Sequence, residues 1–344
     1  MHDIPEWAYA HGGGLFPATI RSVPSDFIVT ENCTIEFSGE GEHDYLWIEK
    51  TGNNTHWVAE CLAKHAGVPL RDVGYAGLKD RNAVTRQWFS VRRLGGVSWD
   101  AFAEEGVVLL EQQRHRRKLR RGAHKGNNFR IALRSDEIAS HVDELDARLT
   151  VIAKQGVPNY FGEQRFGRGG GNIELCKAMF AGRRLSRAKR SIALSSARSL
   201  IFNTILDQRV RDGSWNTILP GELANLDGSA SVFAVDAVTD ELIARCTAYD
   251  IHPSGSLWGD GSPCSSGDVA DLEKNSAAAH AEIAAGLVAA RLDPASRALR
   301  LLVSKLQWSV EDGVLWLEFE LAKGGYATAV LREIAASYRR SSST

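Results

Sequence analysis

The sequence predicts a mixed α/β fold of the α+β class, in a chain long enough for about two domains. The chain has 344 residues, of which 44% are hydrophobic and 24% are charged, and this is an ordinary globular composition. Strand patterns fill the first third, helical patterns dominate the middle, and a strand–helix pattern returns after residue 310. This order indicates strands and helices that pack together rather than an all-α or an all-β protein.

Short segments rich in aromatic and branched residues predict the strands of the first third. They are Tyr45–Lys50, Gln87–Val91, Val107–Leu110 and Phe129–Leu133. Between the first two, apolar residues recur at helical spacing over 57–62, with Thr55 as a candidate N-cap and Gly67 as a stop. In the last segment, Phe129, Ile131 and Leu133 alternate as in a half-buried strand.

The rest of the chain is predicted to be mainly helical. Ser135 is expected to cap a helix over 138–152 that ends at Gly156. Further helices are expected over 192–210, 268–291 and 327–339, with strands and turns over 215–252 and a strand over 314–321. The tail, residues 341–344, is expected to be disordered.

Composition excludes several classes of protein. The formal net charge is −1, which does not support a strongly basic, histone-like binder. The longest apolar run, Ile283 to Ala290, is too short to span a membrane. The first residues lack the apolar segment of a signal peptide. We therefore expect a cytoplasmic protein with no membrane partner.

No cofactor or metal site is indicated. The five cysteines form no CxxC pair, and reduced thiols are the expected state. His280 and Glu282 resemble the start of a deaminase zinc motif, but no PCxxC follows them. No Walker loop is present, and no GxGxxG opens a helix after a strand. We expect neither a metal nor a small-molecule cofactor.

Basic residues are concentrated in two runs, Arg114–Lys125 and Arg183–Arg190. Such a run is usually a solvated face. The first one, however, leads directly into Gly126, two asparagines and Phe129. Cations beside amides and aromatic rings suit single-stranded RNA, whose phosphates need positive charge and whose bases stack.

Three segments combine glycine, aromatic, amide and charged residues: Gly74–Val91, Asn159–Asn172 and Leu321–Ile334. In the first, Asp80 lies between Lys79 and Arg81. Basic neighbours favour an ionised carboxylate, and an ionised, positioned aspartate can act as a nucleophile. The alternative is a surface aspartate that pairs with a cation in a turn.

Together these stretches resemble the tRNA pseudouridine synthase D (TruD) family. The matching stretches are PSDFIVTE, GEGEH, GYAGLKDRNAVTRQWFS, RKLRRGAHKGNNF, VPNYFGEQRFG and GGYATAVLRE, in family order from residue 24 to residue 333. The resemblance implies that tRNA is the partner and that a uridine is isomerised to pseudouridine, usually uridine 13 of tRNA-Glu. It also implies a pseudouridine synthase catalytic domain with a mixed sheet, over 1–154 and 304–344, and an inserted α/β TRUD domain over 155–303.

The family motifs also assign residues. They imply that Asp80 is catalytic, and that the substrate-binding residues are Arg21, Phe27, Asn127, Phe129 and Tyr326. Tyr326 departs from the family, which commonly has phenylalanine at this position, and its hydroxyl needs a partner. The basic runs, including Arg116, Arg117 and Arg120, are expected to hold the tRNA backbone.

The sequence leaves alternatives open. Asp80 attacks C1′ of the sugar or C6 of the ring, or it removes a proton from the sugar to give a glycal intermediate. A non-catalytic tRNA-binding protein or RNA chaperone on the same scaffold is the main alternative function. A hydrolase that releases free uracil is another. We expect a monomer.

Overall fold

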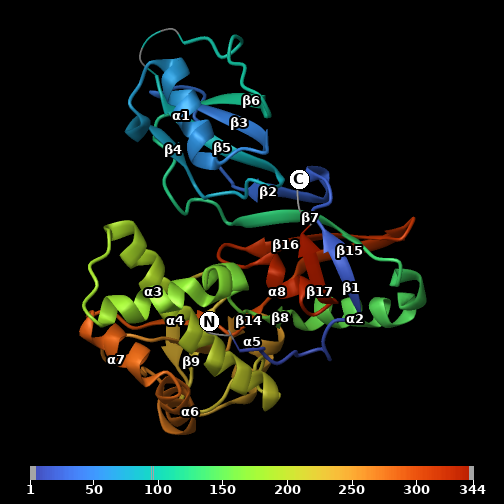
Figure 1. The fold of residues 1–344 in the computed structure, drawn as a ribbon, viewed down its shortest axis with the longest axis vertical. Helices are drawn as coiled ribbons and strands as arrows, with labels where there is room; N and C mark the ends of the chain where they lie inside the picture. Colours follow the sequence, from blue (N-terminus) through green and yellow to red (C-terminus); the bar gives the residue numbers. More distant parts are fainter. Residues whose placement is uncertain (1–4, 94, 96, 341–344) are drawn as a thin grey trace. The chain divides into compact units, whose positions relative to one another are not determined.

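The computed structural model describes residues 5–93, 95 and 97–340, which divide into two compact units (Figure 1). The unit that we call the sheet unit comprises Gly14–Leu149, Val303–Gly325 and the described chain from Ala335. The other, the helical unit, comprises the described chain up to Gly13, Thr150–Leu302 and Tyr326–Ile334. The domain boundaries expected at 154/155 and 303/304, with their TRUD and catalytic assignments, stay a prediction.

One mixed sheet organises the sheet unit, in the order β15-β16-β7-β2-β5-β3-β6. β4 pairs with β5, and β1 pairs with β7 and β17. The pairs β2–β5 and β1–β17 are parallel, and the others are antiparallel. The strands are β1 (Phe16–Ile20), β2 (Phe27–Asn32), β3 (His43–Thr51), β4 (Val73–Tyr75), β5 (Val84–Arg92), β6 (Val107–His115), β7 (Gly126–Arg134), β15 (Ser304–Glu311), β16 (Val314–Ala322) and β17 (Ala335–Arg340).

Helix α1 (Thr55–Ala66) covers one face of β3 and β5. Its buried Val58 and Leu62 pack with Leu46, Ile48 and Phe89 of these strands, as the alternating pattern requires. Gly67 ends α1 in the left-handed conformation at φ 64°, which confirms the predicted stop. The predicted N-cap is wrong: the cap position is Asn54, and the Thr55 side chain bonds to Gln87 instead.

Helix α2 (Val142–Gln155) begins later than predicted. Residues 138–140 form a short 3₁₀ turn that breaks the expected pattern, so Ser135 is not the cap of α2.

The short 3₁₀ turns of the two units are η1 (Pro24–Asp26), η2 (Leu70–Asp72), η3 (Ile138–Ser140), η4 (Glu163–Arg165) and η5 (Arg168–Gly170).

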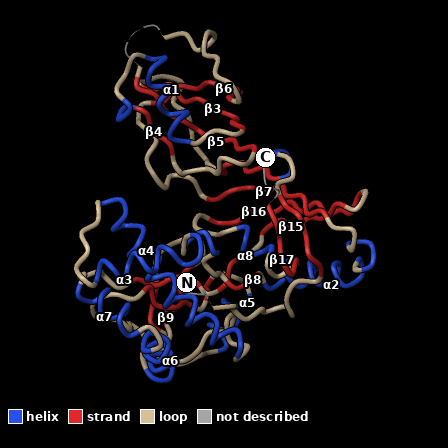
Figure 2. Tube along the Cα trace, viewed as in Figure 1, coloured by secondary structure: helices blue, strands red, loops and turns tan. Residues whose placement is uncertain are grey.

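The helical unit is built around α4 (Arg187–Arg211), whose N-cap Ser186 accepts a hydrogen bond from the Lys189 amide. Figure 2 shows that helices dominate this unit and strands dominate the sheet unit. The other helices are α3 (Gly171–Phe180), α5 (Asp240–Thr247), α6 (Gly267–Ala278), α7 (Ala281–Ala289) and α8 (Ala327–Leu331). Its strands are β8 (Val157–Pro158), β9 (Leu223–Leu226), β10 (Val232–Ala234), β11 (Ile251–His252), β12 (Ser254–Leu257), β13 (Ala295–Ala298) and β14 (Arg300–Leu301).

Several predicted elements are wrong in detail. The closing helix over 327–339 is only α8, because the chain then turns into β17 and pairs with β1. The strand-rich region 215–252 also holds α5, and the helix over 268–291 is interrupted at Ala279 and His280. Helix α3 was not expected. The tail over 341–344 lies outside the described residues.

Candidate active site

Asp80 lies in the loop between β4 and β5 of the sheet unit. Its Oδ2 atom accepts a hydrogen bond from Arg21 Nη2 at 2.7 Å. The Asp80 side chain is 40% exposed, whereas that of Arg21 is 8% exposed. The carboxylate is therefore held by a largely buried guanidinium and remains accessible to a ligand.

Arg21 connects Asp80 to a second predicted residue. Its guanidinium lies over the Phe27 ring, 4.0 Å from the centroid. The Arg21 backbone, directly after β1, has φ 60°, a left-handed conformation that costs a non-glycine residue roughly 1–3 kcal/mol. The surrounding structure holds this strained residue where it contacts Asp80 and Phe27 together.

Strand register places the other predicted residues of this unit on one face of the sheet. Phe129 of β7 lies opposite Val29 of β2 and Phe319 of β16. Its ring meets the edge of Phe27 at 6.3 Å and stacks on Phe319 at 5.3 Å. Asn127 is two residues from Phe129 along β7, so it points to the same face.

The Asn127 carboxamide is partly buried, and its Oδ1 atom has no hydrogen-bond partner among the described residues. A buried unpaired acceptor is costly, and a ligand N–H could satisfy it. The neighbouring Gly126 makes this position possible. A Cβ atom there would lie 2.2 Å from the Leu321 carbonyl oxygen, so only glycine lets β7 and β16 approach closely at this point.

Tyr326 belongs to the helical unit. Its hydroxyl accepts a hydrogen bond from Arg165 Nη2, and this supplies the partner that a tyrosine needs at this position. Its ring lies 6.0 Å from that of Phe161, and the Arg297 guanidinium lies 5.9 Å away. Because Asp80 lies in the sheet unit, a shared site for Tyr326 and Asp80 stays a prediction.

Several side chains that hold the Asp80 loop were not expected from the sequence. Lys50 is fully buried, and its Nζ donates to the carbonyl oxygens of Asp80 and Asn53, both at 2.8 Å. Burial lowers the pKa of Lys50 to about 8, although the charge of Asp80 acts in the opposite direction. Lys50 thus anchors the peptide of the candidate catalytic residue directly.

Thr55 and Gln87 hold the same loop from the α1 side. Thr55 Oγ1 accepts from the Lys79 amide at 2.9 Å and donates to Gln87 Oε1 at 3.0 Å. Gln87 Nε2 in turn donates to the Gly77 carbonyl at 3.0 Å. These bonds fix the backbone on both sides of Leu78, a residue that is 70% exposed.

A buried ion pair completes the loop's supports. Lys79 Nζ lies 2.9 Å from Glu31 Oε2, and both side chains are almost fully buried. Burial raises the pKa of Glu31 above its usual range, and the charge of Lys79 offsets only part of this effect. Glu31 lies opposite Asn127 in the sheet. The loop is therefore tied to the strand pair that carries Phe27, Asn127 and Phe129.

These supports leave little sign in the amino-acid sequence. Lys50 and Glu31 occupy strand positions where a charged residue ordinarily faces solvent. Their partners are many residues away in the chain, so only the folded sheet brings them to the loop.

The described residues hold no group of three or more His, Cys, Asp or Glu side chains that could bind a metal ion. The five cysteines are free thiols. Among the helices in the described ranges, none is long and apolar enough to cross a membrane.

Comparison with known proteins extends this picture over nearly the whole chain. The family model described as tRNA pseudouridine synthase D (TruD) matches residues 8–183 and 173–334. The tRNA pseudouridine synthase D of Methylococcus capsulatus is 47% identical, over 96% of this chain and 94% of that protein. That of Aeromonas salmonicida is 44% identical, over 96% of this chain and 94% of that protein.

The fold agrees with a solved structure as well. A crystal structure from Methanosarcina mazei, assigned to tRNA pseudouridine synthase D, superposes with a TM-score of 0.75. It is 19% identical, and the match covers 96% of each chain.

The fold is of the mixed α+β class, and the chain belongs to the tRNA pseudouridine synthase D family. It is accordingly a tRNA pseudouridine synthase, an isomerase.

Proposed function

We propose that this isomerase converts uridine 13 of tRNA-Glu to pseudouridine and that Asp80 performs the chemistry. The observation that carries the proposal is the accessible Asp80 carboxylate, bonded to Arg21 at 2.7 Å and supported by the buried Lys50. The relatives' shared name supports tRNA as the substrate. The particular uridine follows from the family resemblance.

The reaction exchanges one glycosidic bond for another. The N1–C1′ bond breaks and a C5–C1′ bond forms, while C5 loses its proton and N1 gains one, so no redox partner is needed. The uridine must first leave its stack. Asp80 then attacks C1′ or C6, or removes a sugar proton to give a glycal.

The surrounding residues receive distinct roles in this proposal. Arg21 positions Asp80, and Phe27 supports Arg21 because the guanidinium already covers one face of its ring. Phe129 supplies an apolar wall that keeps water from the intermediate. The Oδ1 atom of Asn127, which has no partner among the described residues, would accept the uracil N3–H. Tyr326 would contact the extruded base.

The test is to map pseudouridine in an unmodified tRNA-Glu transcript after incubation with the purified protein. Carbodiimide labelling followed by reverse transcription locates each pseudouridine. We expect a single stop that reports position 13, and no stop in a transcript with cytidine there. A stop at another uridine would refute the assigned target. Bound but unmodified tRNA would favour the non-catalytic alternative, and free uracil would favour the hydrolase.

Because tRNA is the proposed partner, we expect the protein to act in the cytoplasm. We also expect a monomer that needs no cofactor. Light scattering coupled to gel filtration tests the oligomeric state. Activity that survives dialysis against a chelator would support a metal-independent reaction.

A further inference from the structure

The basic segment that follows β6 is held firmly against the sheet rather than extended into solvent. Tyr45 Oη donates to the Arg117 carbonyl at 2.9 Å, and the Leu119 amide donates to Ser90 Oγ at 2.9 Å. The Leu119 side chain is buried in a cluster that includes Tyr45 and Trp88. The backbone is therefore fixed, and Arg116, Arg117, Lys118, Arg120 and Arg121 remain exposed.

Glycine in β4 permits this close contact. A Cβ atom on Gly74 would lie 2.4 Å from the Leu119 carbonyl oxygen and 2.7 Å from Ser90 Oγ. Lys118 Nζ also donates to the Arg71 carbonyl, which connects the segment to the turn before β4. The segment is thus packed closely against β4 and β5 of the sheet.

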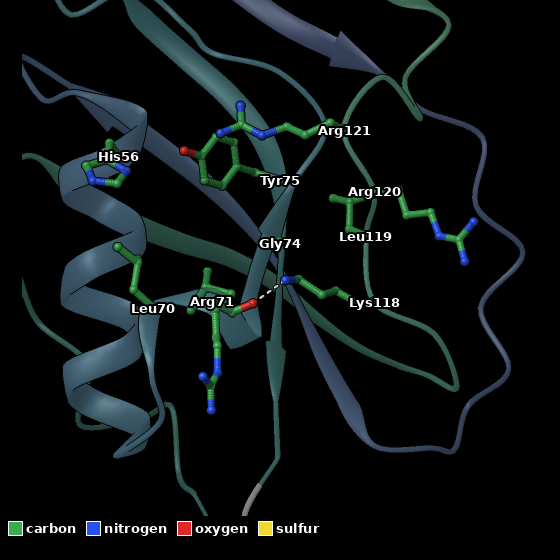
Figure 3. Close-up of a pocket in the computed structure, with 10 residues that line it drawn as sticks. His56, Leu70, Arg71, Gly74, Tyr75, Lys118, Leu119, Arg120 and Arg121 are labelled. Carbon is green, nitrogen blue, oxygen red and sulfur yellow. Dashed lines mark hydrogen bonds between the residues drawn. The ribbon is translucent and has the colours of Figure 1, made fainter. Parts of the chain in front are cut away.

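An open hollow of about 540 Å³ lies between this segment and α1, with Gly74 and Tyr75 between them (Figure 3). It is lined by His56, Leu70, Arg71, Val73, Gly74, Tyr75, Lys118, Leu119, Arg120 and Arg121. None of these ten residues is acidic. His56, one of these ten, lies with its Nε2 atom 3.4 Å from Oε1 of Glu60.

The arginines and the lysine of the hollow have no carboxylate partner among the described residues. Within the part of the chain that the structure describes, Arg71, Lys118, Arg120 and Arg121 form no ion pair with Asp or Glu. Arg116, in the same run, is instead paired with Glu40. Cations that no carboxylate neutralises attract anions, so the lining of the hollow favours an anionic ligand.

Arg121 is also oriented for binding. Its guanidinium lies over the Tyr75 ring, 3.8 Å from the centroid, and Figure 3 shows this stack beside α1. Stacking fixes the plane of the guanidinium and leaves its N–H edge available, the geometry that suits bidentate phosphate contacts.

We propose that this hollow is a second RNA-contact site, which binds backbone phosphates of the tRNA outside the nucleotide that reacts. The proposal rests on the proposed function, because it requires tRNA as the substrate. The hollow adjoins the catalytic loop: β4 leads from Tyr75 into that loop, and His56 follows Thr55, which bonds to Lys79. The hollow and the Asp80 loop therefore share β4 and the start of α1 as supports.

The test compares tRNA binding by the double variant Arg71→Gln/Arg121→Gln with that of its parent, both carrying Asp80→Asn so that the RNA stays unmodified. Losing two phosphate contacts should weaken binding by about tenfold and reduce the slope of log K against log salt by about 1.5. In proteins with Asp80 intact, the same pair should raise KM and leave kcat at saturating tRNA unchanged. Circular dichroism verifies that the variants fold.

Arg130→Gln is the matched control. Arg130 also lies over an aromatic ring, Trp316 at 3.9 Å, but it is paired with Glu318 at 3.0 Å. It should leave the affinity and the salt slope unchanged. An unchanged salt slope in the double variant, or an equal loss in Arg130→Gln, would overturn the proposal. If the wild type binds tRNA without modifying it, the proposed function fails, and the salt slopes still decide the role of the hollow.

Discussion

The Arg21 guanidinium makes two of the contacts in the candidate site. It bonds to Asp80 at 2.7 Å and covers the Phe27 ring at 4.0 Å, from a backbone with φ 60°. A strained residue that makes two such contacts is typical of a functional site. Its role in our account is to position Asp80 rather than to react.

Replacing Arg21 should therefore slow the chemical step more than it weakens binding. A charge-assisted hydrogen bond contributes roughly 1.5–3 kcal/mol, so we expect Arg21→Met to lower the single-turnover rate about 10- to 100-fold. Arg21→Lys, which keeps a charged donor, should recover much of this loss. Single-turnover assays with saturating enzyme measure the effect. Equal rates for wild type and Arg21→Met would contradict the role.

The lowered pKa of Lys50 predicts how the single-turnover rate depends on pH. Its pKa of about 8 means that the ammonium is charged at pH 7 and becomes neutral as the pH rises through 8. A neutral amine donates weaker hydrogen bonds to the Asp80 and Asn53 carbonyls. The single-turnover rate should therefore fall between pH 7 and pH 9.5, with a bend near 8. Lys50→Met should be slow throughout and lack this bend; a bend that persists in Lys50→Met would assign it to another group.

At the scale of elements, local patterns predicted β7 and β16 but missed the last strand, β17, which forms where the chain returns to pair with β1. The strand that the alternation of Phe129, Ile131 and Leu133 predicts is confirmed as β7, although Ala132 between the last two is buried as well, and 314–321 forms most of β16. The predicted closing helix failed because residues 335–340 gain partners in β1, more than 300 residues earlier. Such long-range pairing leaves no local signal, and tertiary contacts override propensity.

A substitution at Gly126 tests how closely β7, which carries Asn127 and Phe129, approaches β16. In Gly126→Ala the new methyl group would meet the Leu321 carbonyl at 2.2 Å, so we expect a loss of about 1–3 kcal/mol in the free energy of unfolding. Urea denaturation measures this loss. The control is Gly171→Ala at the start of α3, where a Cβ atom has open space; it should be neutral or stabilising by up to about 1 kcal/mol. Equal stabilities for the two variants would refute the close approach.

At the scale of the molecule, the proposed site residues come from distant parts of the chain. The family motifs identified them, but the residues' own pattern could not show the buried contacts that support them, such as those of Lys50 with the Asp80 loop. Those contacts depend on β2, β3, β5 and β7 lying together in one sheet. Tyr326 shows the same limit, because its hydroxyl partner Arg165 is 161 residues away.

Asp80 is the residue that we propose carries out the isomerisation. The most direct measurement is tritium release from tRNA labelled with [5-³H]uridine, with wild type and Asp80→Asn assayed side by side and their tRNA binding measured in parallel. We expect release by the wild type, none by Asp80→Asn, and similar binding by both. Release by Asp80→Asn at the wild-type rate, or no release by either protein while tRNA is bound, would contradict it.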